Sequence, residues 1–314
     1  MAIKSLSSSS LTNNVFYRSL LAGNAKAYLG GIAGYAAGGY TGSEVATTDK
    51  FAFPSDSRST LGTGLSVVRQ EPSGMSNAGV AGYAAGGYSG GALTTVDKFA
   101  FPGDSRTTLG TGLSSARTAA AGMSNAGVAG YTAGGGSTVD KFAFPSDSRT
   151  TLATGLSPSR VALAGLSNTG VAGYAAGGNT GSYVSTVDKF AFPSDSRTAL
   201  AVGLSSARYG SAGMSNSGVA GYVAGGYTGS YVSTVDKFAF PSDSRTTLGT
   251  GISSSRYYIT GISDSAVAGY AAGGYTGSYV STVDKFVYPS DSRSTLGTGL
   301  STNRRAAAGF QNGL

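Results

Sequence analysis

The apolar residues of this chain come in short bursts and do not follow the longer 3.6-residue rhythm of a helix. Residues 208–256 show the pattern well, with bursts of four to eight residues that are rich in Val, Phe, Tyr and Thr. Clusters of Gly, Ser, Asn, Asp and Pro separate the bursts, as is typical of segments between β-strands. This segment is predicted to hold four strands: Tyr209–Ser215, Val219–Gly225, Ser233–Phe240 and Thr246–Ile252.

The same segment recurs six times along the 314 residues. A Gly-Tyr pair marks each copy, and its tyrosines are spaced by 48, 48, 43, 48 and 48 residues: Tyr35, Tyr83, Tyr131, Tyr174, Tyr222 and Tyr270. A period of this length with four short strands per unit is typical of a β-propeller, in which each unit forms one blade. We therefore predict an all-β protein with six four-stranded blades.

A Phe-Ala-Phe step in the third predicted strand explains why the copies must pack together. Residues at i and i+2 lie on one face of a sheet, so each blade would offer two aromatic rings to its neighbour. We expect these rings to be buried between blades. The positions are Phe51 and Phe53, Phe99 and Phe101, Phe142 and Phe144, Phe190 and Phe192, Phe238 and Phe240, and Phe286 with Tyr288.

The first copy lacks a recognisable first strand, and the C-terminus supplies a candidate. Arg304–Asn312 matches the start of the third copy, Arg117–Asn125. Pairing of this segment with Ile32–Gly38 would close the ring and leave no exposed strand edge. The predicted domains are a propeller over residues 29–314 and a separate N-terminal arm over residues 1–28.

Each predicted second strand ends in a Gly-Gly doublet, followed by a loop, a Thr-Val-Asp-Lys-Phe strand and an Arg after the fourth strand. In this order the repeat resembles the kelch repeat, which implies a kelch-like propeller. The chain has no Trp, although the kelch pattern places one in the fourth strand. The doublets are Gly38-Gly39, Gly86-Gly87, Gly134-Gly135, Gly177-Gly178, Gly225-Gly226 and Gly273-Gly274.

The N-terminal arm suggests an attachment role. Its Ser5–Ser19 run is similar to the N-termini of tailed-phage virion structural proteins, which implies a tail, fibre or capsid-surface component that contacts other virion proteins or further copies of itself through residues 1–28. The arm has no apolar run of 7–15 residues, so we expect neither a secretory signal nor membrane insertion. The expected location is the virion.

The charge and the reactive side chains exclude several classes of function. The net charge is +7, but each copy carries two Asp, one Lys and two Arg at fixed places, so the excess is spread around the ring. A nucleic-acid site needs clustered cations, so nucleic-acid binding is not expected. The Asp-Ser-Arg turn is expected to be structural, with a local or inter-blade ion pair.

The chain contains no His and no Cys, and 12 of its 15 carboxylates belong to the repeat. We expect no enzyme activity, no cofactor and no metal site, since the repeated Asp of Thr-Val-Asp-Lys-Phe is followed directly by Lys and calcium needs several converging oxygens.

Sequence variation between the copies is concentrated in the loops between the second and third strands and in those between blades. Both sets would lie on one face of a propeller, and they are rich in Tyr and Arg, which are typical of interaction surfaces. Neutral drift of exposed loops is the alternative explanation. The predicted binding residues are Tyr40, Tyr88, Tyr183, Tyr209, Tyr227, Tyr231, Tyr257, Tyr258, Tyr275, Tyr279, Arg208 and Arg256, accompanied by Arg69, Arg117, Arg160, Arg304 and Arg305.

Together these features predict a non-enzymatic virion structural or adhesion protein that binds host-surface polysaccharide or protein through this face. The alternative is a cellular kelch-like scaffold that binds a protein partner by the same face. A propeller hydrolase or lyase is a third class, which nothing in the carboxylate pattern favours.

Overall fold

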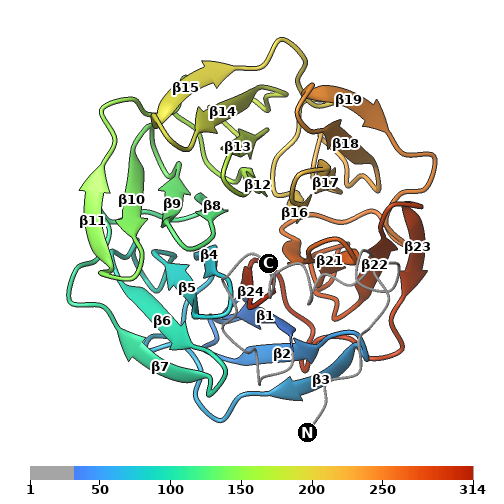
Figure 1. Cartoon of the computed structure of the whole chain (residues 1–314). Coiled ribbons are helices and arrows are strands. Elements are labelled where there is room, and N and C mark those ends of the chain that lie inside the picture. The colour runs from blue at the N-terminus through green and yellow to red at the C-terminus, as the bar shows by residue number, and fades with distance from the viewer. Residues whose placement is uncertain (1–31, 314) are drawn as a thin grey trace, which may run out of the picture. The chain divides into compact units, whose positions relative to one another are not determined.

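The computed structural model describes residues 32–313, which contain 24 β-strands and no helix (Figure 1). The predicted arm over residues 1–28 lies outside the described residues. In the described part no helix has the length and apolarity needed to cross a membrane. The strands form six separate four-stranded antiparallel sheets, arranged as the blades of a propeller. The predicted all-β fold and blade number are confirmed.

Within each blade we name the strands a to d from the axis outward, and number the blades 1 to 6 by the order of their b strands. The a strands are β24 (Ala308–Gln311), β4 (Ser73–Asn77), β8 (Ala121–Asn125), β12 (Ala164–Asn168), β16 (Ala212–Asn216) and β20 (Thr260–Asp264). The b strands are β1 (Ala33–Ala37), β5 (Ala81–Ala85), β9 (Ala129–Ala133), β13 (Ala172–Ala176), β17 (Ala220–Ala224) and β21 (Ala268–Ala272).

The c strands are β2 (Thr48–Ala52), β6 (Val96–Ala100), β10 (Val139–Ala143), β14 (Val187–Ala191), β18 (Val235–Ala239) and β22 (Val283–Val287). The d strands are β3 (Ser57–Thr60), β7 (Ser105–Thr108), β11 (Ser148–Thr151), β15 (Ser196–Ala199), β19 (Ser244–Thr247) and β23 (Ser292–Thr295). The b strands are buried throughout, whereas most d-strand residues are exposed.

The C-terminal strand closes the ring as predicted. Strand β24 pairs antiparallel with β1, with Tyr35 opposite Phe310 and Gly34 opposite Gln311, and Figure 1 shows the two ends of the propeller side by side in red and blue. The side-chain Oδ1 of Asn312 accepts a hydrogen bond from the Ala33 amide at 2.5 Å. Blade 1 therefore has the same four strands as the others, and its inner edge is covered.

Aromatic stacking joins each blade to the next, and the predicted burial of the Phe-Ala-Phe rings is confirmed, with Phe101 only half-buried. Each b-strand tyrosine stacks on the second aromatic residue of the following blade, with ring centroids 4.9–5.2 Å apart. The pairs are Tyr35–Phe101, Tyr83–Phe144, Tyr131–Phe192, Tyr174–Phe240, Tyr222–Tyr288 and Tyr270–Phe53.

The Asp-Ser-Arg turn provides the predicted inter-blade ion pair. At the junction of blades 4 and 5, Asp243 accepts a hydrogen bond from the Tyr174 hydroxyl at 2.8 Å and pairs with Lys189 at 2.6 Å. Its φ of 57° is the left-handed conformation that Asp tolerates better than most residues. Equivalent contacts occur at all six junctions, so this Asp is structural.

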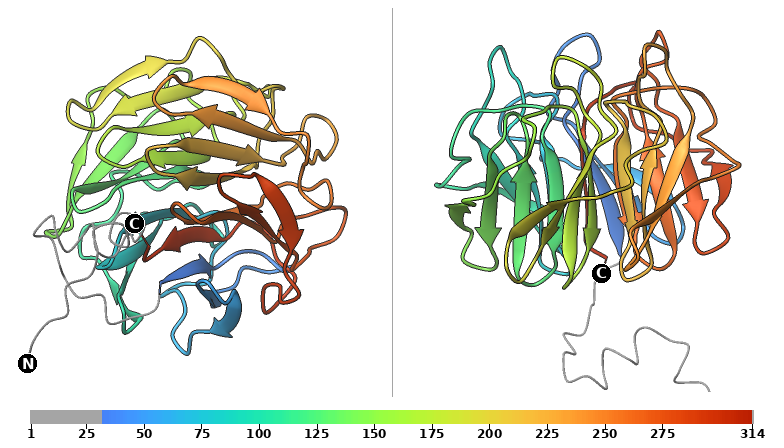
Figure 2. Two further views of the ribbon diagram at one scale, coloured as in Figure 1. Left: turned by 45° about the vertical axis from the view of Figure 1, so that its right-hand side comes forward. Right: turned by 90° about the horizontal axis from the view of Figure 1, so that it is seen from above.

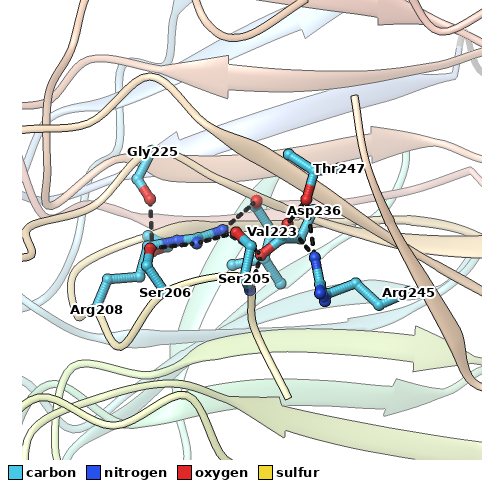
Figure 3. Close-up of polar contacts among 9 residues, drawn as sticks. Ser205, Ser206, Arg208, Val223, Gly225, Asp236, Arg245 and Thr247 are labelled. Carbon is cyan, nitrogen blue, oxygen red and sulfur yellow. Dashed lines mark hydrogen bonds and ion pairs between the residues drawn. The ribbon is translucent and has the colours of Figure 1, made fainter. Parts of the chain in front are cut away.

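A second ion pair at each junction is buried, and Figure 3 shows the pair between blades 4 and 5. Arg208 follows strand β15 and reaches the c strand of blade 5, where its Nη2 lies 2.9 Å from Asp236 Oδ2 and 3.2 Å from the Val223 carbonyl oxygen. Ser205 donates to the same carboxylate oxygen from its amide and its hydroxyl, at 2.8 and 2.9 Å. The Thr-Val-Asp-Lys-Phe aspartates are thus fully occupied in holding blades together.

The loops from strand d to the next strand a form a ring of backbone hydrogen bonds around the axis. Each loop contributes a residue with φ between 52° and 66°: Glu71, Ala119, Ala162, Gly210, Tyr258 and Ala306. The amide of Ala119, for example, donates to the Glu71 carbonyl oxygen at 3.1 Å, and the Ala162 amide donates to Ala119 at 2.7 Å. This ring of hydrogen bonds fixes the position of every d–a loop along the axis and the direction in which the loop runs.

Asp264 in strand β20 departs from the repeat, because the other five copies carry Asn at this place. In those copies the Asn Oδ1 accepts a backbone N–H, as Asn216 does from Ala266 at 3.1 Å. Burial raises the pKa of the Asp264 carboxyl; with the opposing effect of Lys285 and a further rise from Asp56, the pKa is about 6. The charged form is therefore disfavoured in the folded protein.

We predict that Asp264→Asn stabilises the protein in a pH-dependent manner. The folded-state pKa is raised above the unfolded value of about 4, so folding takes up a proton between these values and wild-type stability falls as pH rises through them. A shift of about two units corresponds to at most about 3 kcal/mol. The gain should be fully present above about pH 7 and absent below about pH 4, as measured by urea unfolding of both proteins. A gain that does not change with pH would contradict the burial of this carboxyl.

Candidate binding face

The loops between strands b and c and the d–a loops meet on one side of the ring. In the right-hand view of Figure 2 the long b–c loops rise together from this side. In five of the six blades the d–a loop that enters the blade pairs with the b–c loop of that same blade, as Tyr209 does with Tyr227 through an amide-to-carbonyl hydrogen bond of 3.0 Å. The predicted gathering of these two loop sets on one face is therefore correct.

The tyrosines on this face form repeated groups of three, one at each of three successive blade junctions. Each group contains the second Tyr of one b–c loop, the residue after the buried d–a Arg, and the first Tyr of the next b–c loop. We call them triad 1 (Tyr183, Tyr209, Tyr227), triad 2 (Tyr231, Tyr257, Tyr275) and triad 3 (Tyr279, Arg305, Tyr40).

Ring contacts within and between the triads make them one continuous surface. In triad 1 the centroid of Tyr209 lies 5.1 Å from that of Tyr183 and 5.7 Å from that of Tyr227. In triad 2 the Tyr231 ring stacks on Tyr257 at 5.3 Å with an interplanar angle of 20°. Tyr227 lies 5.6 Å from Tyr257 and so connects the two triads. The rings therefore hold one another in position by direct contact.

The b–c loop explains the spacing of the two tyrosines that each loop supplies. Tyr227 and Tyr231 form a bridge across a Thr-Gly-Ser turn, and Gly229 in that turn has a φ of 110°, which residues with a Cβ rarely adopt. The same turn recurs between Tyr275 and Tyr279, where Gly277 also has a φ of 110°. The same turn sequence thus places the two tyrosine rings of a loop at similar centroid distances in successive blades, 5.5 Å and 5.2 Å.

Arg305 occupies in triad 3 the place that Tyr209 and Tyr257 hold in triads 1 and 2. Its guanidinium carbon lies 5.1–5.9 Å from the centroids of five tyrosine rings: Tyr40, Tyr257, Tyr258, Tyr275 and Tyr279. Its Nη1 also donates to the Tyr257 hydroxyl at 3.1 Å. Arg305 is thus the positive centre of the tyrosine surface.

Tyr258 joins the triads to the axis. Its ring centroid lies 4.8 Å from that of Tyr257 and 5.9 Å from that of Tyr209, and its backbone belongs to the axial hydrogen-bond ring. Beside it is a cavity of about 90 Å³ lined by d–a loop residues, among them Glu71, Ala162 and Ser211. A cavity of this size holds a few water molecules and not a sugar ring.

The other three junctions carry different side chains. Between blades 1 and 2 the equivalent residues are Glu44, Gln70 and Tyr88, with Gln70 Nε2 3.4 Å from Glu44 Oε1. The remaining two junctions hold other side chains, among them Thr118 at one and Val161 and Asn179 at the other. Tyr88 makes no ring contact with another described aromatic residue and is 38% exposed. Nine of the ten predicted tyrosines are therefore brought together, and Tyr88 lies apart.

Two predicted site residues are wrong. Arg208 and Arg256 have 0% of their surface exposed, because each reaches inward to a c-strand aspartate, Asp236 or Asp284. The same holds for the equivalent Arg69, Arg117, Arg160 and Arg304, all of which are buried. These arginines hold the loops of this face in place from the interior of the protein and contribute no surface to the face.

The electrostatics favour neutral tyrosine hydroxyls on this face. Burial raises the pKa of Tyr209 to about 12, and burial together with the nearby Glu71 raises that of Tyr258 well above its ordinary value. The Tyr209 and Tyr258 hydroxyls therefore keep their protons at neutral pH and can both donate and accept a hydrogen bond. Among residues 32–313 no group of three or more potential metal ligands occurs. The arrangement is suited to non-covalent recognition.

No protein-family model and no curated protein sequence matches this chain. The six-bladed propeller is therefore shown by the arrangement of the strands in the structure. The chemistry of the tyrosine face is the basis for a functional proposal.

Proposed function

We propose that this protein is a non-enzymatic adhesion module that binds polysaccharide through triads 1 to 3. In the full proposal it is a kelch-like propeller of a tailed-phage virion, in the tail, a fibre or the capsid surface. Residues 1–28 attach it to other virion proteins, and the tyrosine face binds the host surface. The observation that carries the binding proposal is the continuity of the three triads, which occur at successive junctions on one face of the propeller.

The geometry supports a saccharide because it offers flat rings with polar edges in a repeated arrangement. Tyr rings supply contact area at low conformational-entropy cost, and their hydroxyls pair with the hydroxyls of a bound molecule. Mutual packing of the rings lowers the entropy lost on binding still further. Triads spaced by one blade also match a ligand that is itself built from repeated units, such as a polysaccharide chain.

A glycan array of bacterial surface polysaccharides tests this proposal. Tyr231→Ala should weaken binding at least tenfold, which corresponds to about 1.4 kcal/mol, since an aromatic anchor at the centre of an interface is often worth this much or more. Tyr231 is the suitable choice because it lies near a loop tip, away from the blade-joining ion pairs. Tyr88→Ala is the matched control, because Tyr88 holds the equivalent loop position of Tyr227 but lies outside the triads, and it should bind like wild type. Equal weakening by both substitutions would contradict a site at the triads.

The second candidate is a protein-binding scaffold of a cellular kelch-like type. It is favoured by the joint presence of Tyr and Arg, the residues most enriched at the energetic centres of protein interfaces. The two candidates separate on intact target cells. Loss of binding after periodate oxidation of surface sugars supports the saccharide, whereas resistance to periodate with loss after protease treatment supports the protein partner.

A further inference from the structure

Arg305 differs electrostatically from every other basic residue that the structure describes. The six lysines and the other twelve arginines of residues 32–313 each have a carboxylate oxygen within 4 Å. Arg305 has none. Its Nε is buried without an acceptor, and its one side-chain hydrogen bond is the donation from Nη1 to Tyr257.

The surrounding rings hold the guanidinium in place without neutralising it. Five tyrosine faces within 6 Å attract the cation through their quadrupoles, but they carry no net negative charge. The two acidic residues of the b–c and d–a loops are engaged elsewhere, as Glu71 accepts from the Thr118 hydroxyl at 2.6 Å and Glu44 faces Gln70 at 3.4 Å. The positive charge of the half-buried Arg305 is therefore available to a ligand on the tyrosine surface.

We propose that Arg305 is the anion-recognition residue of the tyrosine face, and that the ligand is a saccharide chain bearing an acidic unit. This inference rests on the proposed function and names its ligand class. The guanidinium binds a carboxylate or sulfate group, whose charge-assisted hydrogen bonds are the stronger kind. The sugar units on either side lie against triads 2 and 3.

The charge on this face does not suit a polyanion that carries a negative charge on every unit. Nucleic acids present a phosphate at every residue and are bound by several clustered cations. This face offers one unpaired cation among three triads, and Glu44 at the next junction would repel a second anionic group. The best match is a chain with separated acidic units between neutral sugar rings.

The test uses the full chain and a panel of polysaccharides in matched forms. The panel contains carboxylated chains, the same chains after methyl esterification, sulfated chains and neutral chains. Wild type should prefer a carboxylated or sulfated member at least tenfold over its neutral counterpart, since a hydrogen-bonded charge is worth this much. Loss of the preference on esterification identifies the carboxylate as the group bound, and a preference for sulfated chains alone identifies the sulfate.

Arg305→Tyr is the decisive variant, because it converts triad 3 to the composition of triads 1 and 2 and so is compatible with the fold. Its affinity for acidic chains should fall at least tenfold, to that for the matched neutral chains, and it should melt at the same temperature as wild type. If acidic preference persists in this variant, or if wild type prefers neutral chains, the inference is wrong although the proposed saccharide function stands. If wild type binds no member of the panel, both are wrong.

Discussion

Removal of residues 306–314 is expected to destroy the cooperative fold of the propeller. The deletion takes away strand β24 and with it Phe310, which is fully buried between the rings of Tyr35 and Phe99 at centroid distances of 5.2 and 5.5 Å. Loss of one such ring costs about 3–5 kcal/mol, and the total stability of a typical domain is about 5–15 kcal/mol. The exposed edge of β1 would in addition be free to pair with a strand of another molecule.

Size-exclusion chromatography and thermal melting of the truncated chain check this expectation. The result should be aggregates or linked oligomers without a sharp transition, whereas a chain that lacks only Leu314 and keeps the Asn312 hydrogen bonds should melt like wild type. Addition of a synthetic peptide of residues 306–313 should restore part of the transition. A truncated monomer with an unchanged melting temperature would show that the ring does not depend on its closing strand.

Asp236→Ala should be the most damaging single substitution of a polar residue. It leaves the guanidinium of Arg208 fully buried without its counter-ion, which typically costs about 3–5 kcal/mol. The Ser205 amide and hydroxyl also lose their acceptor. Urea unfolding should show a lower midpoint. A cost below about 1 kcal/mol would mean that the pair is not buried in solution.

Thr247→Ala provides the matched control for this pair. Thr247 donates to Asp236 Oδ1 at 2.7 Å, but blade 4 already carries Ala199 at the equivalent place. There Arg197 approaches Asp188 Oδ1 to 3.0 Å, whereas Arg245 stays at 3.5 Å from Asp236. Arg245 is expected to make the same adjustment in the variant, so the substitution should cost no more than about 1 kcal/mol, the net worth of one hydrogen bond.

The same network predicts acid sensitivity. Although burial raises the pKa of Asp236, Arg208 and the hydrogen bonds from Ser205 and Thr247 outweigh it and hold that pKa below its ordinary value. A carboxyl with a lowered folded-state pKa contributes stability above its unfolded pKa of about 4 and loses it as pH falls further. Wild type should therefore unfold more readily below about pH 4, through several such carboxyls at once.

The fold could be predicted from the sequence because each local signal repeats. Every copy supplies the same strand and turn residues, so an accidental burst of apolar residues in one copy is corrected by the other five. The strand ends were harder to place. The predicted first strand began at Tyr209, but β16 begins at Ala212, because Tyr209 belongs to the loop pairing of the binding face. The fourth strand lies earlier than predicted, at Ser244–Thr247, since pairing with β18 resumes directly after the tight turn at Asp243.

The binding face could be predicted only in part. The tyrosines were found because their positions vary between copies, but the arginines were assigned by residue type, and Arg is normally exposed. Every copy has an Arg at the place of Arg208 and Arg256 and an Asp that pairs with it, a pattern typical of structural residues. Arg305 stands in a variable place where two other copies have Tyr. Separating repeated from unrepeated arginines would have pointed to Arg305, although the absence of a carboxylate near it is visible only in three dimensions.

The a strands carry one glycine each at the point of closest approach to the axis: Gly74, Gly122, Gly165, Gly213, Gly261 and Gly309. A Cβ on any of them would overlap the carbonyl of the preceding glycine in the ring. Because the six a strands are in direct backbone contact, the circumference of the inner ring is fixed. The inner ring, and not the outer strands, therefore sets the number of copies of the repeat. A gene that gained a seventh copy would not encode a slightly wider propeller. It would encode a surplus blade, and only replacement of these glycines by larger residues could make room for it.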